Sequence, residues 1–135
     1  MKKLLSLTLS LIIATACAFL IACDKDPLVI KDSDTLVVVT ADTDENISLI
    51  DYINSLDEFK DMFVIENGMV MAIDGVANKA DWSECWMIYT SDTEMANTSW
   101  GQIEYKGEIY GSAIVGAEQL TVKKGCIYIF VYQSF

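Results

Sequence analysis

Cysteines and carboxylates are the groups through which this 135-residue chain could do chemistry. It contains four cysteines and twenty acidic residues, but no histidine and no arginine. The absence of imidazole excludes Ser–His–Asp and Cys–His catalysis within the chain, together with zinc sites that require histidine. The absence of guanidinium excludes bidentate recognition of phosphate or carboxylate by arginine. We therefore predict a protein that is not an enzyme and uses no cofactor.

Paired carboxylates are the alternative chemistry, since two of them suffice for acid–base hydrolysis of a glycoside. With twenty acidic residues some neighbours are inevitable, so proximity in the sequence does not identify a pair. The stretch 42–45, Asp-Thr-Asp-Glu, begins like a calcium loop. It lacks the third acidic position, the glycine and the distal glutamate of an EF-hand. We expect a solvated turn here and no metal site.

The N-terminal segment has the layout of an export signal, in which two lysines precede an uncharged stretch at residues 4–23. A retained membrane helix is the alternative, because this stretch is near the lower length limit for spanning a bilayer. Residues 20–23, Leu-Ile-Ala-Cys, resemble the bacterial lipobox. In lipoproteins a peptidase cuts before that cysteine after a diacylglyceryl group is attached to its sulfur. The resemblance implies a signal peptide at residues 1–22 and a lipidated Cys23.

Export and lipidation together predict a protein held at the cell membrane, facing the extracellular or periplasmic side. Cleavage before Cys23 would leave 113 residues with seven lysines and twenty acidic residues, a net charge of −13. Such a surface repels nucleic acids and anionic lipid head groups. Membrane lipid, reached through acylated Cys23, is therefore an expected partner, and nucleic acid is not.

Cys85 and Cys126 are the two cysteines left in the predicted mature chain. An exported compartment permits a disulfide between them, which would close a loop of about 40 residues and stabilise the fold by roughly 3–4 kcal/mol. The alternative is that both are small buried hydrophobes, a common role for a free cysteine. The bond requires adjacent strands in a particular register, which the sequence does not fix.

The elements that must position these groups are mostly strands. Residues 23–34 are polar and are expected to form a tether, followed by one domain at residues 35–135. A capping box at Ser48 and Asp51 predicts a helix over residues 47–58. Apolar runs predict strands at residues 36–41, 63–65, 69–73, 82–90, 120–122 and 126–132, with an Asn-Gly hairpin turn at residues 67–68. Residues 103–110, which contain Lys-Gly at 106–107, are a candidate hairpin. The last strand is apolar on both faces and should be central. We expect an α+β, β-grasp-like fold, with one helix packed on a mixed sheet of four to five strands.

Several of these segments are similar, in order and spacing, to the transcobalamin-like C-terminal domain family. The matching stretches are residues 48–53, 71–76, 82–89 and 120–132. The resemblance covers about residues 35–135 and implies a β-grasp-like binding module. Animal cobalamin carriers use this domain to cover one face of the corrinoid, so a corrinoid-like small molecule is a candidate ligand. Two departures are a longer loop after residue 90 and Gly125-Cys126 at the position of the family's Gly-Asp.

Aromatic residues near the strand ends suggest where a ligand or partner would bind. Trp82, Tyr89 and Trp100 are the candidate contact residues, and Trp100 lies in a stretch of small polar residues. The alternative is that Trp86 and Tyr89 belong to the core, which leaves only Trp82 and Trp100 exposed. The sequence thus predicts a membrane-anchored, non-catalytic ligand-binding or surface module. Its alternative is a structural or protein-interaction subunit of a cell-envelope complex.

Overall fold

The computed structural model describes residues 28–135 of the chain. The predicted signal peptide at residues 1–22, the lipidation site Cys23 and the first part of the tether lie outside the described residues. Within residues 28–135 no helix is long and apolar enough to cross a bilayer.

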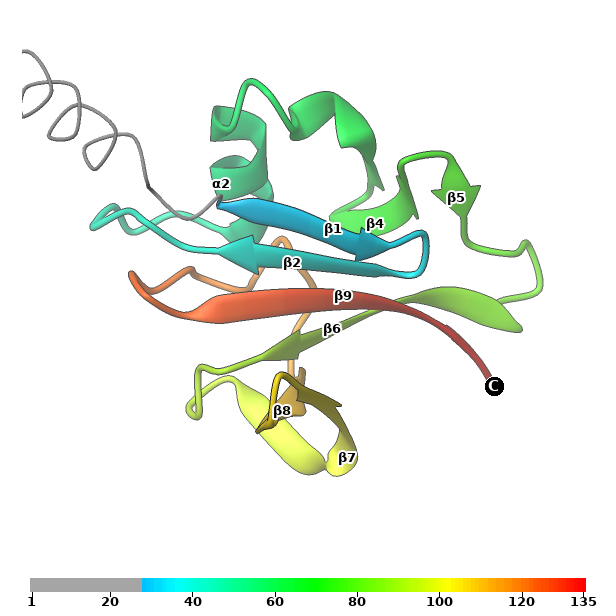
Figure 1. The fold of residues 1–135 in the computed structure, drawn as a ribbon. Helices are drawn as coiled ribbons and strands as arrows, with labels where there is room; N and C mark the ends of the chain where they lie inside the picture. The colour runs from blue at the N-terminus through cyan, green and yellow to red at the C-terminus, as the bar shows by residue number, and fades with distance from the viewer. Residues whose placement is uncertain (1–27) are drawn as a thin grey trace, which may run out of the picture.

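A six-stranded sheet forms the centre of the domain (Figure 1). Its strands follow the order β1-β2-β9-β6-β8-β7, and every neighbouring pair is antiparallel. The strands are β1 (Val29–Ser33), β2 (Leu36–Thr40), β6 (Glu84–Thr90), β7 (Ala96–Tyr105), β8 (Glu108–Ala113) and β9 (Ile127–Ser134). The prediction that the last strand is central is confirmed, because β9 lies between β2 and β6.

A second, three-stranded sheet and a short helix cover one face of the large sheet (Figure 1). The small sheet has the order β3-β4-β5, and it is preceded by a single 3-10 turn. These elements are α2 (Leu49–Ser55), η1 (Lys60–Met62), β3 (Phe63–Glu66), β4 (Met69–Ile73) and β5 (Val76–Ala77).

Helix α2 begins where its capping box predicts. The backbone N–H of Asp51 donates to Ser48 Oγ at 3.1 Å, which satisfies one of the free amides at the helix N-terminus. The helix ends earlier than predicted, because the N–H of Leu56 bonds to the carbonyl of Ile53 and starts a turn. Its buried face is Leu49, Tyr52 and Ile53.

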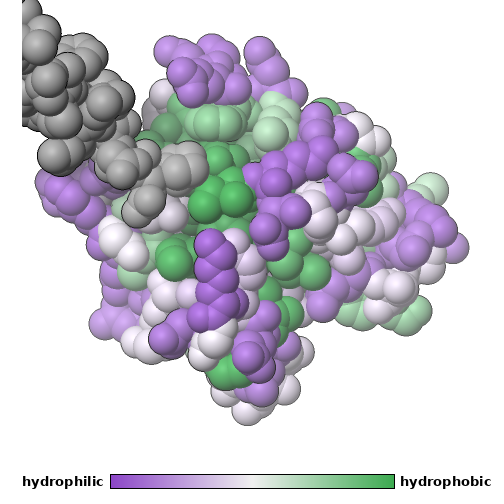
Figure 2. Space-filling view, viewed as in Figure 1, coloured by the Kyte–Doolittle hydropathy of each residue, from purple (hydrophilic) through white to green (hydrophobic). Residues whose placement is uncertain are grey.

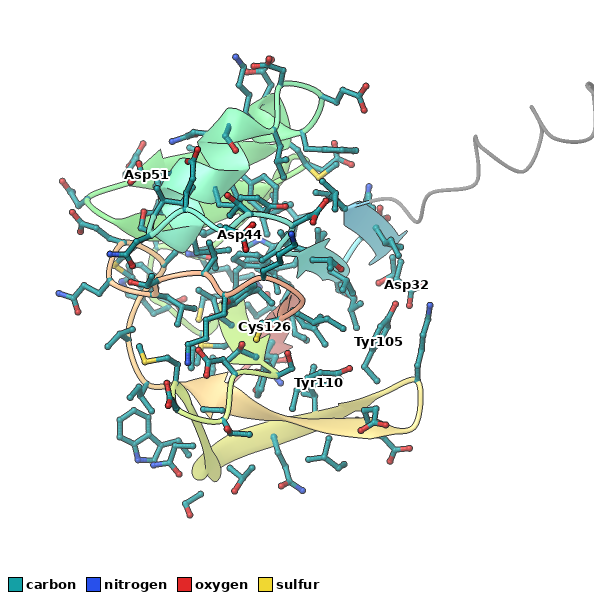
Figure 3. The ribbon with its side chains drawn as sticks, turned by 90° about the vertical axis from the view of Figure 1, so that its left-hand side faces the viewer. Asp32, Asp44, Asp51, Tyr105, Tyr110 and Cys126 are labelled. Carbon is teal, nitrogen blue, oxygen red and sulfur yellow. The ribbon has the colours of Figure 1, made fainter. Side chains whose placement is uncertain are left out.

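Alternating side chains explain why β2 and β9 are apolar on both faces. Val37 and Val39 enter the core under α2 and the small sheet, whereas Val38 faces the opposite side. Along β9, Phe130 enters the first core and Ile129 the second. The second core is covered by the β7–β8 hairpin, from which Tyr105 and Tyr110 reach toward β1 and β2 (Figure 3). Both faces of the central strands are therefore buried, as period-two alternation requires.

The predicted α+β, β-grasp-like fold is wrong. The described residues are mostly β, with nine strands in two antiparallel sheets, where one mixed sheet of four to five strands was expected. Three segments that were not predicted as strands are strands: the two-residue Val76–Ala77, and two longer ones. The longer two are Val29–Ser33, assigned to the tether, and the first part of Ala96–Tyr105, assigned to a loop. Both are edge strands that carry many polar, exposed residues, so they lack the apolar pattern by which a strand is recognised.

The predicted Asn-Gly hairpin is confirmed. Asn67 and Gly68 have φ angles of 50° and 76° and join β3 to β4. Two consecutive residues with positive φ form the type I′ turn, whose twist matches that of a β-hairpin. The turn places Gly68 and Met69 against the loop that follows β8, as the groove described below shows.

Candidate functional site

The three predicted contact residues do not form one surface. Tyr89 is buried, and its hydroxyl hydrogen-bonds Gln133 Oε1 at 2.6 Å, so the alternative that placed it in the core describes the structure. Trp100 is 67% exposed and projects from a wide bulge in edge strand β7. Trp82 is 45% exposed and lies in the loop before β6. Trp82 is therefore the predicted residue that lies at a hollow in the surface.

The hollow is a groove of about 330 Å³ between the two sheets. One wall is the first part of β6, from Cys85 to Ile88, and the other is the turn and first residues of β4, from Gly68 to Val70. Residues 112–117 form one end, and Trp82 and Asn78 complete the lining. The groove exists because β8 leaves β6 early: the two strands pair only at Tyr89 and Thr90.

The lining is apolar and soft. It contains no charged side chain, and it brings together two tryptophans, two methionines and a cysteine: Trp82, Trp86, Met69, Met87 and Cys85. Methionine and cysteine sulfurs are polarisable, and methionine adapts its shape to what it contacts. Such a lining can exclude water and hold an aromatic or aliphatic group of a ligand.

The Asn78 amide and the Trp86 indole, two polar side-chain groups in the groove, are committed to structural bonds. Asn78 donates from Nδ2 to the Val70 carbonyl at 3.0 Å and accepts at Oδ1 from the Trp86 N–H at 2.8 Å. The Trp86 indole donates from Nε1 to the Val76 carbonyl at 2.8 Å. These bonds join the small sheet to β6 and fix the Trp86 ring on the floor of the groove.

The cysteine in the groove is a poor nucleophile. Burial raises the pKa of the Cys85 thiol, because desolvation disfavours the thiolate. Its Sγ lies 4.0 Å from Met87 Sδ. The groove therefore offers apolar contact and no activated group.

The disulfide that the sequence left open does not form, and both described cysteines are free thiols. Cys85 pairs with Gln133 near the end of β9, whereas Cys126 precedes the first residue of β9. The two positions are thus separated by most of the length of the β6–β9 ladder, roughly 20 Å at about 3.4 Å per residue. A disulfide requires Cα atoms within about 7 Å. Figure 3 shows Cys126 in the loop that leads into β9.

Apolar side chains are exposed around the groove. Met69, Trp82 and Ile114 are 48%, 45% and 39% exposed, and all three belong to the groove. They account for three of the seven large hydrophobic residues exposed in the described part of the chain. Single exposed hydrophobes are ordinary, but a cluster at a concave site indicates binding. Sequence reasoning missed Met69 and Ile114, because they lie 45 residues apart and no local pattern joins them.

Carboxylates surround the apolar lining. Asp81 accepts hydrogen bonds from Ser83 Oγ at 2.7 Å and Ser83 N at 3.1 Å, which lower its pKa and keep it ionised. Glu118 lies against the Cα of Gly68, so closely that a side chain on this glycine would meet it. Lys79 is the cation in this region, and it is paired with Glu84. The rim therefore has excess negative charge. Figure 2 shows one face of the domain, on which hydrophilic residues stand out around an area of hydrophobic ones.

Asp92 is a buried carboxylate with a structural role outside the groove. Its Oδ1 accepts from the Glu94 N–H at 3.1 Å and from Lys123 Nζ at 3.2 Å, and this ties two loops together. Among residues 28–135 no group of three acidic or cysteine side chains could hold a metal ion. The stretch 42–45 lies in the loop between β2 and α2.

No protein-family model matches the chain, and neither a curated protein nor a solved structure was found to be similar to it.

Proposed function

We propose that the protein is an exported lipoprotein, anchored to the cell membrane through Cys23, whose domain binds a ligand without catalysis. The observation that carries the binding site is the apolar groove between the sheets, with Met69, Trp82 and Ile114 exposed around it. The lipobox-like sequence at residues 20–23 supports the anchor.

The size and chemistry of the groove indicate what part of a ligand it holds. A volume of about 330 Å³ is at the lower end for small-molecule sites and suits one aromatic or branched aliphatic group. A whole corrinoid would extend far beyond it. The corrinoid resemblance also loses support because the β-grasp-like fold that it implied is not observed.

A site-specific test uses methionine methyl groups as reporters in ¹³C-labelled protein, prepared with its lipid anchor in phosphatidylcholine nanodiscs. Titration with phenethylamine, an aromatic cation, should shift the methyl signals of Met69 and Met87 saturably, whereas Met62 outside the groove stays unchanged. Cyanocobalamin, titrated in the same way, tests the corrinoid alternative. If every methyl signal shifts alike, or none shifts, the groove is not a binding site.

The anchor is tested separately by metabolic labelling with a radioactive fatty acid. The native chain should incorporate label and remain with the membrane fraction, and Cys23→Ser should lose the label. Cys126→Ser is the matched control, because this thiol lies in the folded domain and should not affect acylation. Equal labelling of the native chain and Cys23→Ser would refute lipidation at this position.

A further inference from the structure

The groove has a property that an ordinary hydrophobic pocket lacks, because one of its walls is the open edge of a strand. β6 pairs with β9 over its whole length, from Glu84 to Thr90. On its other side it pairs with β8 only at Tyr89 and Thr90. No strand of residues 28–135 pairs with the first five residues of β6 on this side.

The direction of the backbone groups of β6 follows from bonds at its two ends. Next to β9, the Phe135 N–H bonds to the Ser83 carbonyl at 2.9 Å, and the Ser91 N–H bonds to the Ile127 carbonyl at 3.0 Å. Odd-numbered residues of β6 therefore face β9. Backbone groups alternate between the two edges of an antiparallel strand, so even-numbered residues face the opposite edge.

At two of the even-numbered positions, one backbone group already has a hydrogen-bond partner. The Glu84 carbonyl accepts from the Lys79 N–H at 2.9 Å, and the Trp86 N–H donates to Asn78 Oδ1 at 2.8 Å. The next groups along this edge are the Trp86 carbonyl and the Ile88 N–H, and both residues line the groove. The strand that would continue the ladder departs here, since no residue of β8 after Ser112 pairs with β6. The Ile114 N–H instead continues the pairing with β7 by bonding the Met95 carbonyl at 3.0 Å.

A carbonyl followed two residues later by an N–H on the same edge is the arrangement that pairs with one residue of a parallel extended chain. That residue would lie opposite Met87, donate its N–H to the Trp86 carbonyl and accept from the Ile88 N–H. Its side chain would lie on the same side of β6 as Cys85 and Met87, which belong to the groove lining, and its two neighbours would point to the side of Trp86 and Ile88. The opening spans about two residues, roughly 7 Å, so it accommodates a short extended stretch rather than a long strand. Adding an extended peptide to a sheet edge is a recurrent mode of recognition.

The charge of the rim selects the composition of such a peptide. Asp81, Glu84 and Glu118 stand near the groove, and the only nearby lysine in the described residues, Lys79, is already paired with Glu84. A second copy of this chain is a poor occupant, because the chain has a formal net charge of −11 and like charges repel. A peptide with lysine or arginine beside its apolar residue complements this rim.

We propose that the ligand of the groove is an extended, basic peptide segment of a partner protein, which adds to the open edge of β6 at Trp86 and Ile88. This rests on the proposed function, because it assigns a ligand class to the same groove. The apolar side chain of the segment lies against Cys85 and Met87 at the β6 edge of the groove, its backbone pairs with β6, and its flanking basic residues face the acidic rim.

The test compares four peptides on the lipid-anchored chain in phosphatidylcholine nanodiscs, with empty nanodiscs as the blank. The first is Ac-Lys-Thr-Leu-Thr-Lys-NH₂, and the second carries N-methyl-leucine at its centre, which removes the N–H that would bond Trp86. The third replaces both lysines by glutamate, and the fourth replaces leucine by glycine. The shifts of the Met69 and Met87 methyl signals report occupancy of the groove.

We expect the first peptide to bind most tightly. N-methylation should weaken binding roughly 5- to 10-fold, since it removes one backbone hydrogen bond. Exchange of both lysines for glutamate should weaken it on the order of 5- to 10-fold, an effect that added salt reduces. The Ile88 amide should also exchange its hydrogen more slowly in the complex. Trp82→Ala should weaken binding, whereas Trp100→Ala, which removes a more exposed tryptophan outside the groove, should not.

The outcomes separate this inference from the proposed function. If phenethylamine shifts Met69 and Met87 but the first peptide does not, the groove binds small molecules and the peptide inference is overturned. If the N-methylated and native peptides bind equally, pairing with β6 is overturned. If the acidic peptide binds as well as the basic one, selection by charge is overturned. If no probe shifts either methionine, both the inference and the proposed binding site fail.

Discussion

Asn78 should be one of the most sensitive positions in the domain, because its side chain joins the small sheet to the large one. It donates to the Val70 carbonyl and accepts from the Trp86 N–H, and both partner residues are only 7% exposed. Asn78→Ala leaves both backbone groups without their side-chain partner, in residues that are almost fully buried. An unsatisfied buried group costs about 1–3 kcal/mol, so the variant should lose about 2–4 kcal/mol of unfolding free energy. This is a large fraction of the roughly 5–15 kcal/mol that stabilises a typical domain.

Urea unfolding followed by tryptophan fluorescence measures this loss. With a typical slope of about 2 kcal/mol per molar urea, the midpoint should fall by about 1–2 M at unchanged slope. Asn78→Asp retains an acceptor for the Trp86 N–H but no donor for the Val70 carbonyl, so its loss should lie between those of alanine and the wild type. Gln119→Ala is the matched control, because this amide side chain is exposed. A midpoint for Asn78→Ala within about 0.2 M of the wild type would refute the idea that this side chain holds the sheets together.

Three further predictions concern thiols, a turn and alkaline pH. Both thiols should react with a maleimide in denaturant without reductant, and in the folded protein Cys126 should react before Cys85, whose pKa is raised by burial. Gly68→Ala should destabilise the domain more than Gly75→Ala, because both residues have positive φ but only the first lies against another side chain, as denaturation midpoints would show. Burial raises the pKa of Tyr128 above its usual 10.0, so its contribution to stability is complete below that pH and is lost as the pH rises through the raised pKa. Tyr128→Phe should therefore lose less unfolding free energy between pH 9 and 12 than the wild type, as unfolding followed by circular dichroism would show. If the unfolding free energies of both proteins fall equally steeply with pH, this explanation is wrong.

Local signals in the sequence predict those elements whose burial, capping or turn is encoded within a few consecutive residues. Residues 36–39 of β2 and residues 127–132 of β9 are apolar at every position, and burial on both faces of a central strand is what this pattern requires. Ser48 and Asp51 predict the start of α2 because the cap bond is made within one turn of chain. The Asn67-Gly68 hairpin is predictable because few residue pairs tolerate two successive positive φ angles.

The edge strands and the groove carry no comparable signal. In β1 only Val29 is buried, and the exposed residues that follow it read as a polar tether. The register of β7 shifts between Asn97 and Gln102, and this interrupts the alternation of inward and outward side chains around Trp100. The groove depends on where β8 separates from β6, which is a matter of register between distant segments. The cysteine pair shows the same dependence, since only the β6–β9 register reveals that the two thiols are far apart.

The separation of β8 from β6 also explains why one place on the domain combines apolar and polar recognition. Had β8 continued along β6, its side chains would fill the groove and its backbone would occupy the Trp86 carbonyl and the Ile88 N–H. Because it departs, the same gap leaves apolar side chains without cover and backbone groups without a strand partner among the described residues. An extended segment satisfies both requirements at once, whereas a purely apolar molecule satisfies only the first. The acidic rim then acts at longer range, where it favours approach by cations and disfavours approach by anionic lipid head groups. If the protein is anchored through Cys23 as we propose, this division would keep the groove facing solvent and available to a basic partner.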